Sequence, residues 1–212
     1  MEFKKYKILF VGVFDRDKKS TNTSQLISFK KIGHDIVGYN YRQKANMIGP
    51  AQRDLDLIKE IKNNNYDLVV FSKCNDIQSH VFEKATSVSK TCLWFMDSIV
   101  NYDDSMKIKT SMVDYVCCDK INVLLEATKI NKNAFLVHEG FDETVDKPYN
   151  LEKEFDVTFI GSIYGKRLSI INKIVRGVTS FSGIYNTEHA KVVSKSKINL
   201  NFCTKNDAPN RS

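Results

Sequence analysis

The sequence predicts an α/β fold, in which apolar strands alternate with helices along the chain. Two observations carry this prediction. Apolar runs such as YKILFVGV (6–13) are continuous, which is typical of strands buried on both faces of a sheet. Between them lie stretches with helical spacing, such as 50–65, where Leu55, Ile58 and Ile61 are expected on one side. This alternation favours a mostly parallel sheet with helices on both faces.

The first series of elements occupies about 140 residues, the size of one complete domain. Ser20, Thr21 and Asn22 are candidate caps of its first helix, Gly33 is typical of a helix end, and Pro50 fits a first helical turn. We expect strands at 6–13, 34–41, 66–72, 90–97, 113–118 and 133–140, and helices at 20–33, 50–65, 77–89, 104–112 and 119–128.

A second, shorter series follows the polar stretch 142–153, which is expected to be a linker. Three strands and two helices are less than half of a doubly wound domain, and so small a domain buries too little surface to be stable alone. We therefore expect domains at 1–145 and 150–212, the second truncated. Either it leans on the first, or the natural protein continues beyond Ser212. The expected strands are 155–162, 175–183 and 196–203, and the expected helices are 164–174 and 186–195.

The composition is that of a globular protein, with 42% hydrophobic and 27% charged residues among 212. No run of about 18 apolar residues exists, so no integral membrane segment is expected. The basic and apolar N-terminus has no cleavage site and is interpreted as a first strand. The five cysteines have no metal-ligand spacing, which predicts buried free thiols in a reducing, cytoplasmic compartment and no metal.

The net charge of +7 is concentrated at the C-terminal end. Residues 151–212 hold 10 Lys and Arg against 5 Asp and Glu, whereas residues 1–150 hold 22 against 20. A basic end indicates an anionic partner such as a phosphorylated metabolite, a nucleic acid or a membrane surface. Ordinary surface lysines are the alternative. A nucleic acid is not favoured, because the basic end has no interleaved aromatic residues and no known motif.

The stretch FIGSIYGKR (159–167) is the strongest local candidate for an anion site. Gly161 follows a predicted strand, and ligands of open parallel sheets bind beyond the carboxyl ends of strands. Lys166 and Arg167 fall in the first turn of the next helix, where they oppose the helix dipole unless a phosphate binds there. The spacing is not that of a P-loop. An exposed loop with incidental cations is the alternative.

The order of several motifs resembles that of a known family. FDVTFIGSIYGKR matches a strand ending in F-[IV]-G-x-x-Y-G-x-R, and the stretch from Gly183 to Ser212 matches G-x-Y-x-x-E, K-I-x-L-N and a loop ending in N-R. KILFVGVF, TNTSQLISFKKIGHDIVGYNYR, WFMDS and HEGFD match elements of the family's first half. The chain therefore resembles glycosyltransferases of the GT-B type, and within them the family that includes the spore-maturation CgeB-like proteins. The second-half matches include Gly183, Tyr185, Lys197, Asn199 and Asn201.

This resemblance implies two Rossmann-like domains that face each other across a cleft. The nucleotide-diphosphate sugar would lie mainly on the C-terminal domain, and the glycan, protein or small-molecule acceptor mainly on the N-terminal one. The implied enzyme is a hexosyltransferase that needs no metal and no cofactor, because basic groups and helix N-termini neutralise the leaving diphosphate. A non-catalytic nucleotide- or sugar-binding relative with an incomplete donor site is the alternative. A nicotinamide dehydrogenase is disfavoured, since no G-x-G-x-x-G follows either opening strand.

The resemblance assigns donor binding to residues of the second half. Arg211 with Asn210 is the first candidate, since a guanidinium binds phosphate oxygens bidentately. Relatives follow this loop with a helix that carries a donor-binding glutamate, and that helix is missing here. Asn199 and Asn201 are either core amides or ligand contacts. The remaining donor or phosphate candidates are Gly161, Tyr164, Gly165, Lys166, Arg167, Glu188 and His189.

An inverting transfer needs a base for the acceptor hydroxyl, and three residues are candidates: Asp97, Asp15 and His138. Asp97 ends a predicted strand, and its alternative role is a helix cap. Asp15-Arg16-Asp17 is a formal match to a metal-binding Asp-x-Asp motif, but it follows the first strand, which is the wrong place. Trp94 and Phe95 are expected in the core, and Glu139 and Gly140 are candidates for contact with the donor sugar.

Overall fold

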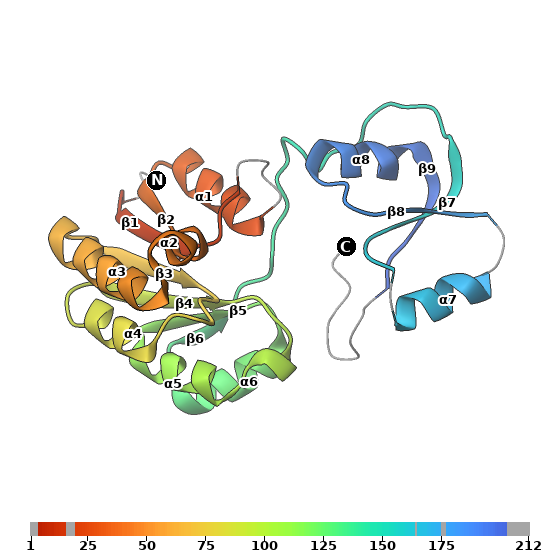
Figure 1. Ribbon diagram of the computed structural model, residues 1–212. Coiled ribbons are helices and arrows are strands. Elements are labelled where there is room, and N and C mark those ends of the chain that lie inside the picture. Colours follow the sequence, from red (N-terminus) through yellow and green to blue (C-terminus); the bar gives the residue numbers. More distant parts are fainter. Residues whose placement is uncertain (1–3, 16–19, 164, 175–176, 203–212) are drawn as a thin grey trace. The chain divides into compact units, whose positions relative to one another are not determined.

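The computed structural model describes residues 4–15, 20–163, 165–174 and 177–202. The chain divides into two compact units, residues 1–139 and residues 140–212, which we call unit 1 and unit 2 (Figure 1). The boundary falls inside HEGFD, a few residues before the limits expected from the sequence. Each unit has its own parallel sheet.

Unit 1 contains a six-stranded sheet in which every neighbouring pair is parallel, so the predicted α/β fold is confirmed for this part of the chain. The strand order is β2-β1-β3-β4-β5-β6. The strands are β1 (Lys7–Gly12), β2 (Asp35–Asn40), β3 (Leu68–Ser72), β4 (Lys90–Phe95), β5 (Tyr115–Cys118) and β6 (Ala134–Leu136).

In the described part of unit 1, six α-helices lie between these strands: α1 (Thr21–Lys31), α2 (Tyr41–Ile48), α3 (Pro50–Asn64), α4 (Ser79–Thr86), α5 (Asp104–Met112) and α6 (Ile121–Ile130). The sequence did not predict α2. It begins directly at the end of β2, where the Asn40 side chain accepts a hydrogen bond from the Gln43 N–H and caps the helix. The expected inward face of α3 was partly wrong, because Leu57 and Ile61 are buried whereas Leu55 is exposed.

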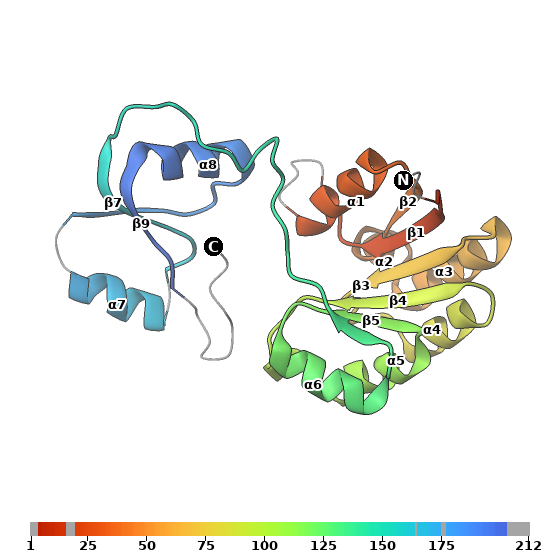
Figure 2. The same ribbon diagram turned by 180° about the vertical axis from the view of Figure 1, so that it is seen from behind.

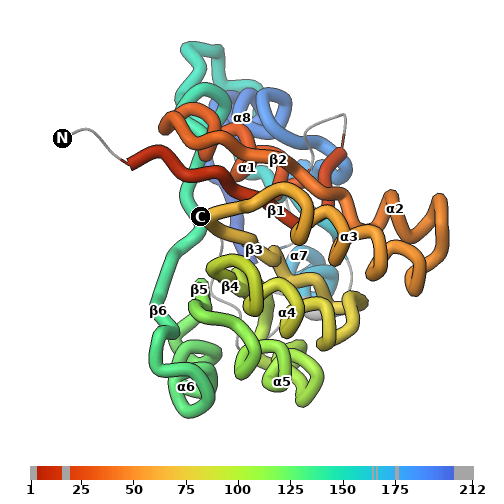
Figure 3. The backbone as a smooth tube through the Cα atoms, turned by 90° about the vertical axis from the view of Figure 1, so that its left-hand side faces the viewer, coloured from red at the N-terminus to blue at the C-terminus, as the bar shows by residue number. Residues whose placement is uncertain are grey.

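The main core lies on the face of the sheet that α3, α4, α5 and α6 cover (Figure 3). Side chains of the four central strands meet those of the helices there, and Phe71 packs on Phe82 with ring centroids 4.2 Å apart. Phe95 belongs to this core, as predicted. Other members are Leu9, Val69, Leu93, Val116, Val81 and Val123.

The other face, which we call the second face, is covered differently. Among the described helices of unit 1, only α1 packs there, through Leu26 and Phe29 over β1 and β2. Helices were expected on both faces, and the distribution follows from the strand order. The step from β1 to β2 runs in one direction across the sheet and all later steps run in the other, so right-handed crossovers place α1 alone on the second face. Figure 2 shows the sheet from this side.

Unit 2 contains a three-stranded parallel sheet in the order β8-β7-β9. Its strands are β7 (Phe155–Ile160), β8 (Val178–Phe181) and β9 (Ser196–Leu200), and its helices α7 (Lys166–Ile174) and α8 (Asn186–Lys195) lie on opposite faces of the sheet (Figure 1). Phe159 is buried in its centre and stacks on Phe202. The three strands and two helices of the prediction are therefore present.

Four of the five cysteines are described, and all four are buried free thiols, as the sequence predicted: Cys74, Cys92, Cys117 and Cys118. Cys203 lies outside the described residues. Within the described ranges, every helix is too short or too polar to cross a lipid bilayer.

A buried arginine joins α3 to the loop between β3 and α4. Arg53 is fully buried, and its Nε donates to Asp54 Oδ1 at 2.6 Å. Its other nitrogens reach Asp76, with Nη1 3.2 Å from the carboxylate and Nη2 2.8 Å from the backbone carbonyl. The guanidinium carbon lies 5.7 Å from the centre of the Tyr41 ring. The charge is thus neutralised inside the fold and holds the loop after β3 in place.

We expect Arg53→Met to lower the free energy of unfolding by about 3 kcal/mol, because Asp54 would stay buried without its partner. Denaturant unfolding followed by circular dichroism measures this change. The matched control is Lys129→Met, which removes an exposed pair with Glu126 and is expected to leave the midpoint unchanged. Equal effects of the two substitutions would show that the Arg53 cluster adds nothing to stability.

Candidate functional site

The carboxyl ends of β1 and β3 form the natural ligand position of unit 1. Within the sheet, β2 lies next to β1 on one side and β3 lies next to it on the other. Ligands of open α/β sheets bind at such a switch point of the strand order. Gly12 ends β1 and Ser72 ends β3. The residues that follow these two strands are therefore the first to consider.

Asn22 joins the two strand ends. Its Oδ1 accepts the Val13 N–H at 2.9 Å, and its Nδ2 donates to Ser72 Oγ at 2.7 Å and to Gln25 Oε1 at 2.9 Å. A Cβ at Gly12 would lie 2.8 Å from Asn22 Oδ1, so only glycine leaves room for this amide. The sequence named Asn22 as a candidate cap, but Ser20 is the cap of α1 and Asn22 bridges the strands.

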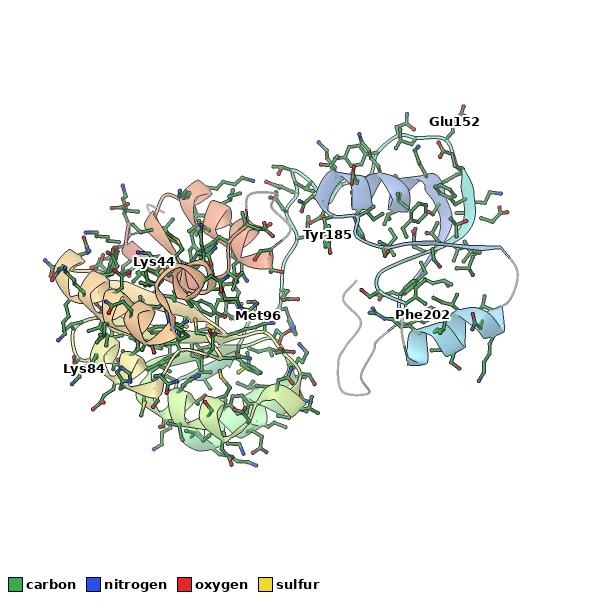
Figure 4. All side chains as sticks on the ribbon, in the orientation of Figure 1. Lys44, Lys84, Met96, Glu152, Tyr185 and Phe202 are labelled. Carbon is green, nitrogen blue, oxygen red and sulfur yellow. The ribbon has the colours of Figure 1, made fainter. Side chains whose placement is uncertain are left out.

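The hydrogen-bonded chain continues to the neighbouring strand. Gln25 Nε2 contacts Met96 Sδ at 3.0 Å, and Met96 lies where β4 ends (Figure 4). A polar line therefore crosses the carboxyl ends of β1, β3 and β4. It consists of side chains from α1 and from the strand ends, which rigid elements hold in position.

The two residues after β3 have an unusual backbone. Lys73 and Cys74 both have positive φ, at 59° and 54°, which non-glycine residues adopt only where the surroundings hold them. The buried Lys109 does so here, since its Nζ donates to the carbonyls of Cys74 at 3.2 Å and Asn75 at 2.7 Å. Burial lowers the pKa of the Lys109 ammonium below its usual range. Strain of this kind is common where a backbone serves a binding site.

Asp97, a predicted catalytic residue, lies directly beyond β4 at this edge. Its Oδ2 is 3.6 Å from Lys73 Nζ, and its Oδ1 accepts the Ser98 N–H at 2.8 Å. The carboxylate is 30% exposed, so a ligand can reach it. An accessible carboxylate beside an ammonium group is able to bind a hydroxyl and to accept its proton.

The two other predicted bases lie elsewhere along the edge. Asp15 follows β1, and its N–H donates to Thr23 Oγ1 at 3.3 Å. His138 follows β6, the outermost strand, where it is exposed. The Asp-x-Asp candidate cannot be placed, because Arg16 and Asp17 lie outside the described residues. In the described part of the chain, no three His, Cys, Asp or Glu side chains come together as a metal site.

In unit 2, the predicted glycine turn lies at the carboxyl end of the central strand β7. Gly161 has φ 150° and Gly165 has φ 54°, so both positions favour glycine. The Gly161 N–H donates to the Phe181 carbonyl at 2.9 Å and continues the pairing of β7 with β8. Because β8 and β9 flank β7 on opposite sides, this turn also lies at a switch point.

Arg167 closes this turn against the end of β9. Its Nε donates to the Phe202 carbonyl at 3.0 Å and its Nη1 to the Ser162 carbonyl at 3.3 Å. The guanidinium also lies over the Phe159 ring, 5.5 Å from its centre, and Phe202 lies beside the start of α7 (Figure 4). The sequence predicted a phosphate contact and did not reveal this structural role; the phosphate contact stays a prediction.

The other donor candidates divide into three groups. Glu188 is exposed in the first turn of α8, where a carboxylate suits the helix dipole, and His189 beside it is half-buried. Asn199 is a satisfied amide, since Oδ1 accepts from Thr158 Oγ1 at 2.7 Å and Nδ2 donates to the Val193 carbonyl at 3.2 Å. Tyr164, Asn210, Arg211 and the side chain of Lys166 lie outside the described residues.

Sequence reasoning missed Ser72 and Lys73 as members of the unit 1 site. A signal was present, because both follow the apolar run YDLVVF directly and therefore stand at the carboxyl end of a strand. The bridging role of Asn22 had no such signal, since it depends on a contact 50 residues away.

The comparisons with known proteins add no relative. No protein-family model matches the chain, and no curated protein matches it in sequence.

We expect Asn22→Asp to lower the free energy of unfolding by about 2 kcal/mol, because the carboxylate keeps the shape of the amide but loses both of its donated hydrogen bonds. Thermal and denaturant unfolding measure this change. Asn122→Asp is the control, since Asn122 uses its Oδ1 as an acceptor for the Val123 N–H, which aspartate also provides. A drop of the same size in both variants would contradict the bridging role.

Proposed function

We propose that this protein is a glycosyltransferase, which transfers a sugar from a nucleotide-diphosphate donor to an acceptor hydroxyl without a metal ion. The observation that carries the proposal is the pair of glycines with positive φ, Gly161 and Gly165, that lies between β7 and the start of α7. Gly161 directly follows β7, the central strand, at the switch point of the sheet. The order of motifs along the chain supports the same function.

The N-terminus of α7 supplies the chemistry for a diphosphate. The first N–H groups of a helix have no partner within the helix, and they carry partial positive charge. At the start of α7, the Ser169 N–H donates to the Gly165 carbonyl at 3.3 Å. The excess of basic residues in 151–212 favours an anion there as well.

The acceptor side of the reaction is assigned to unit 1. In an inverting transfer, the acceptor oxygen bonds to the anomeric carbon, the bond from that carbon to the diphosphate breaks, and the diphosphate leaves with the electron pair. A base takes the hydroxyl proton. Asp97 is the proposed base, because its carboxylate is accessible and the contacts with Lys73 and Ser98 orient it.

A second candidate function is nucleotide or sugar binding without catalysis. The observation that favours it is the placement of Arg167, two of whose nitrogens donate hydrogen bonds to the Phe202 and Ser162 carbonyls. An arginine that closes a turn contributes less to the neutralisation of a leaving group. Binding assays do not separate the two functions, whereas donor hydrolysis and sugar transfer do.

We expect Gly161→Ala to weaken the binding of nucleoside diphosphates about tenfold, which corresponds to about 1.4 kcal/mol. The added Cβ would lie 3.3 Å from the Phe159 ring and 3.4 Å from Arg167 Nη1, at a φ that alanine rarely adopts. Isothermal titration with the uridine, guanosine and thymidine diphosphates measures the effect. The control is Gly177→Ala, where φ is 87° but a Cβ meets no atom within 4 Å. No binding of any of the three diphosphates to the natural chain would contradict the donor site.

We expect Asp97→Asn to lower the transfer rate at least about 100-fold while diphosphate affinity stays unchanged, because only the proton acceptor is lost. A coupled assay of diphosphate release with a panel of nucleotide sugars measures the rate. Asp103→Asn is the control, since Asp103 caps α5 through its Oδ1 and asparagine caps equally well. Unchanged turnover in Asp97→Asn would remove Asp97 as the base, and binding without turnover in the natural chain would favour the second candidate.

A further inference from the structure

The part of the second face that α1 does not cover contains a groove of about 470 Å³, which we call the second-face groove. Strands β3 to β6 form its floor, and the view in Figure 2 looks toward this side of the sheet. Its volume lies within the range of about 300–1,000 Å³ that is typical of small-molecule sites. The lining residues that carry the argument are Phe29, Val70, Cys92, Trp94, Cys117 and Phe135.

The groove suits an uncharged, apolar ligand. Among the described residues that line it, only Asp67 and Lys90 are charged, and both lie at the end where the strands begin. Both are engaged already: Asp67 accepts the Lys7 N–H at 2.8 Å, and Lys90 pairs with Asp114 at 2.8 Å. Aromatic and aliphatic side chains make up most of the remaining wall, so a charged ligand would lose its hydration without gaining a partner.

Two thiols meet in this groove. Cys92 on β4 and Cys117 on β5 lie with their sulfur atoms 3.3 Å apart, close enough for one thiol to donate a hydrogen bond to the other. The hydrogen bond from Cys92 lowers the pKa of the Cys117 thiol, while the same contact, with burial, raises that of Cys92. Cys117 is therefore the better nucleophile, since the thiolate is the reactive form.

The strand register opposes a disulfide between these thiols. Cys92 pairs with Tyr115, so Cys117 lies two residues further along β5. With strands about 4.8 Å apart and a rise of about 3.3 Å per residue, the two α-carbons are roughly 8 Å apart. A disulfide needs less than about 7 Å. Cys92 and Cys117 are therefore expected to remain reduced thiols and not to form a disulfide with each other.

Trp94 provides a third feature. It pairs with Cys117 in the register of β4 and β5 and lines the same groove. Its indole Nε1 is buried and has no hydrogen-bond acceptor in the described part of the chain. A buried donor without a partner costs about 1–3 kcal/mol. A ligand whose carbonyl oxygen reaches Nε1 when the partly buried indole shifts would recover that energy.

We propose that the second-face groove is a covalent ligand site, in which the Cys117 sulfur adds to an apolar α,β-unsaturated carbonyl compound. The sulfur forms a bond to the β-carbon, the carbon–carbon π bond breaks, and its electrons move to the carbonyl oxygen as an enolate. The α-carbon then takes up one proton, which replaces the proton lost by the thiol. Nothing is oxidised or reduced, and the product is a thioether.

The chain contains matched internal controls. Cys118 is the neighbour of Cys117 on β5 but points into the main core on the opposite face, where burial raises the pKa of its thiol to about 12. Cys74 is also in the main core, and burial raises the pKa of its thiol too. The proposal therefore predicts different reactivities for Cys117 and Cys118, which are adjacent on β5.

The experiment treats the full chain with cyclohexenone and maps each modified cysteine by fragment-ion mass spectrometry. We expect Cys117 to react at least ten times faster than Cys118 and Cys74. The rate is expected to saturate as the cyclohexenone concentration rises, because binding in the groove precedes addition. Negatively charged iodoacetate is expected to show no saturation and no preference of this size for Cys117.

Two variants separate the roles of the neighbours. Cys92→Ala removes the thiol that donates to the Cys117 sulfur and is expected to slow the addition about tenfold, because less of Cys117 is then in the reactive thiolate form. Trp94→Phe keeps an aromatic wall but removes the N–H, and is expected to raise the half-saturating concentration of cyclohexenone. Two results with the natural chain would each overturn the proposal. One is that Cys117 is modified no faster than Cys118, and the other is that the rate rises linearly with cyclohexenone concentration.

Discussion

All six strands of unit 1 run in the same direction, and this constraint organises the molecule. Their carboxyl ends meet at one edge, so polar residues from distant parts of the sequence arrive together there: Asn22 from α1, Ser72 from β3 and Asp97 after β4. Parallel strands require crossovers of one hand, and the strand order then decides which face each helix covers. The position of the candidate catalytic edge and the placement of α1 alone, among the described helices of unit 1, on the second face thus have the same origin.

Buried charge holds this edge in shape. Arg53 and Lys109 both reach the loop after β3, Arg53 through Asp76 and Lys109 through the carbonyls of Cys74 and Asn75. The positive φ angles of Lys73 and Cys74 persist because these contacts outweigh their cost. The contact between Lys73 and Asp97 therefore depends on two buried cations, Arg53 and Lys109.

Within the described residues, periodicity and turn residues were sufficient to predict every strand and every α-helix except α2. They failed at α2, because Asn40 ends a strand and caps a helix at the same position. They also failed to predict that, among the described helices of unit 1, α1 alone lies on the second face, since local patterns contain no information on strand order. At the candidate sites, the sequence correctly predicted that Gly161 and Asp97 lie at the carboxyl ends of strands. The hydrogen bonds of Arg167 to the Ser162 and Phe202 carbonyls had no signature in the sequence.

The close approach of Asn22 to Gly12 has a consequence for the evolution of this fold. The amide occupies the space that any side chain at position 12 would need, and it also satisfies the first N–H after β1. The two positions are therefore not independent. A lineage that replaces the glycine must first, or at the same time, shorten the residue on α1, so related sequences should vary at these two sites together or at neither.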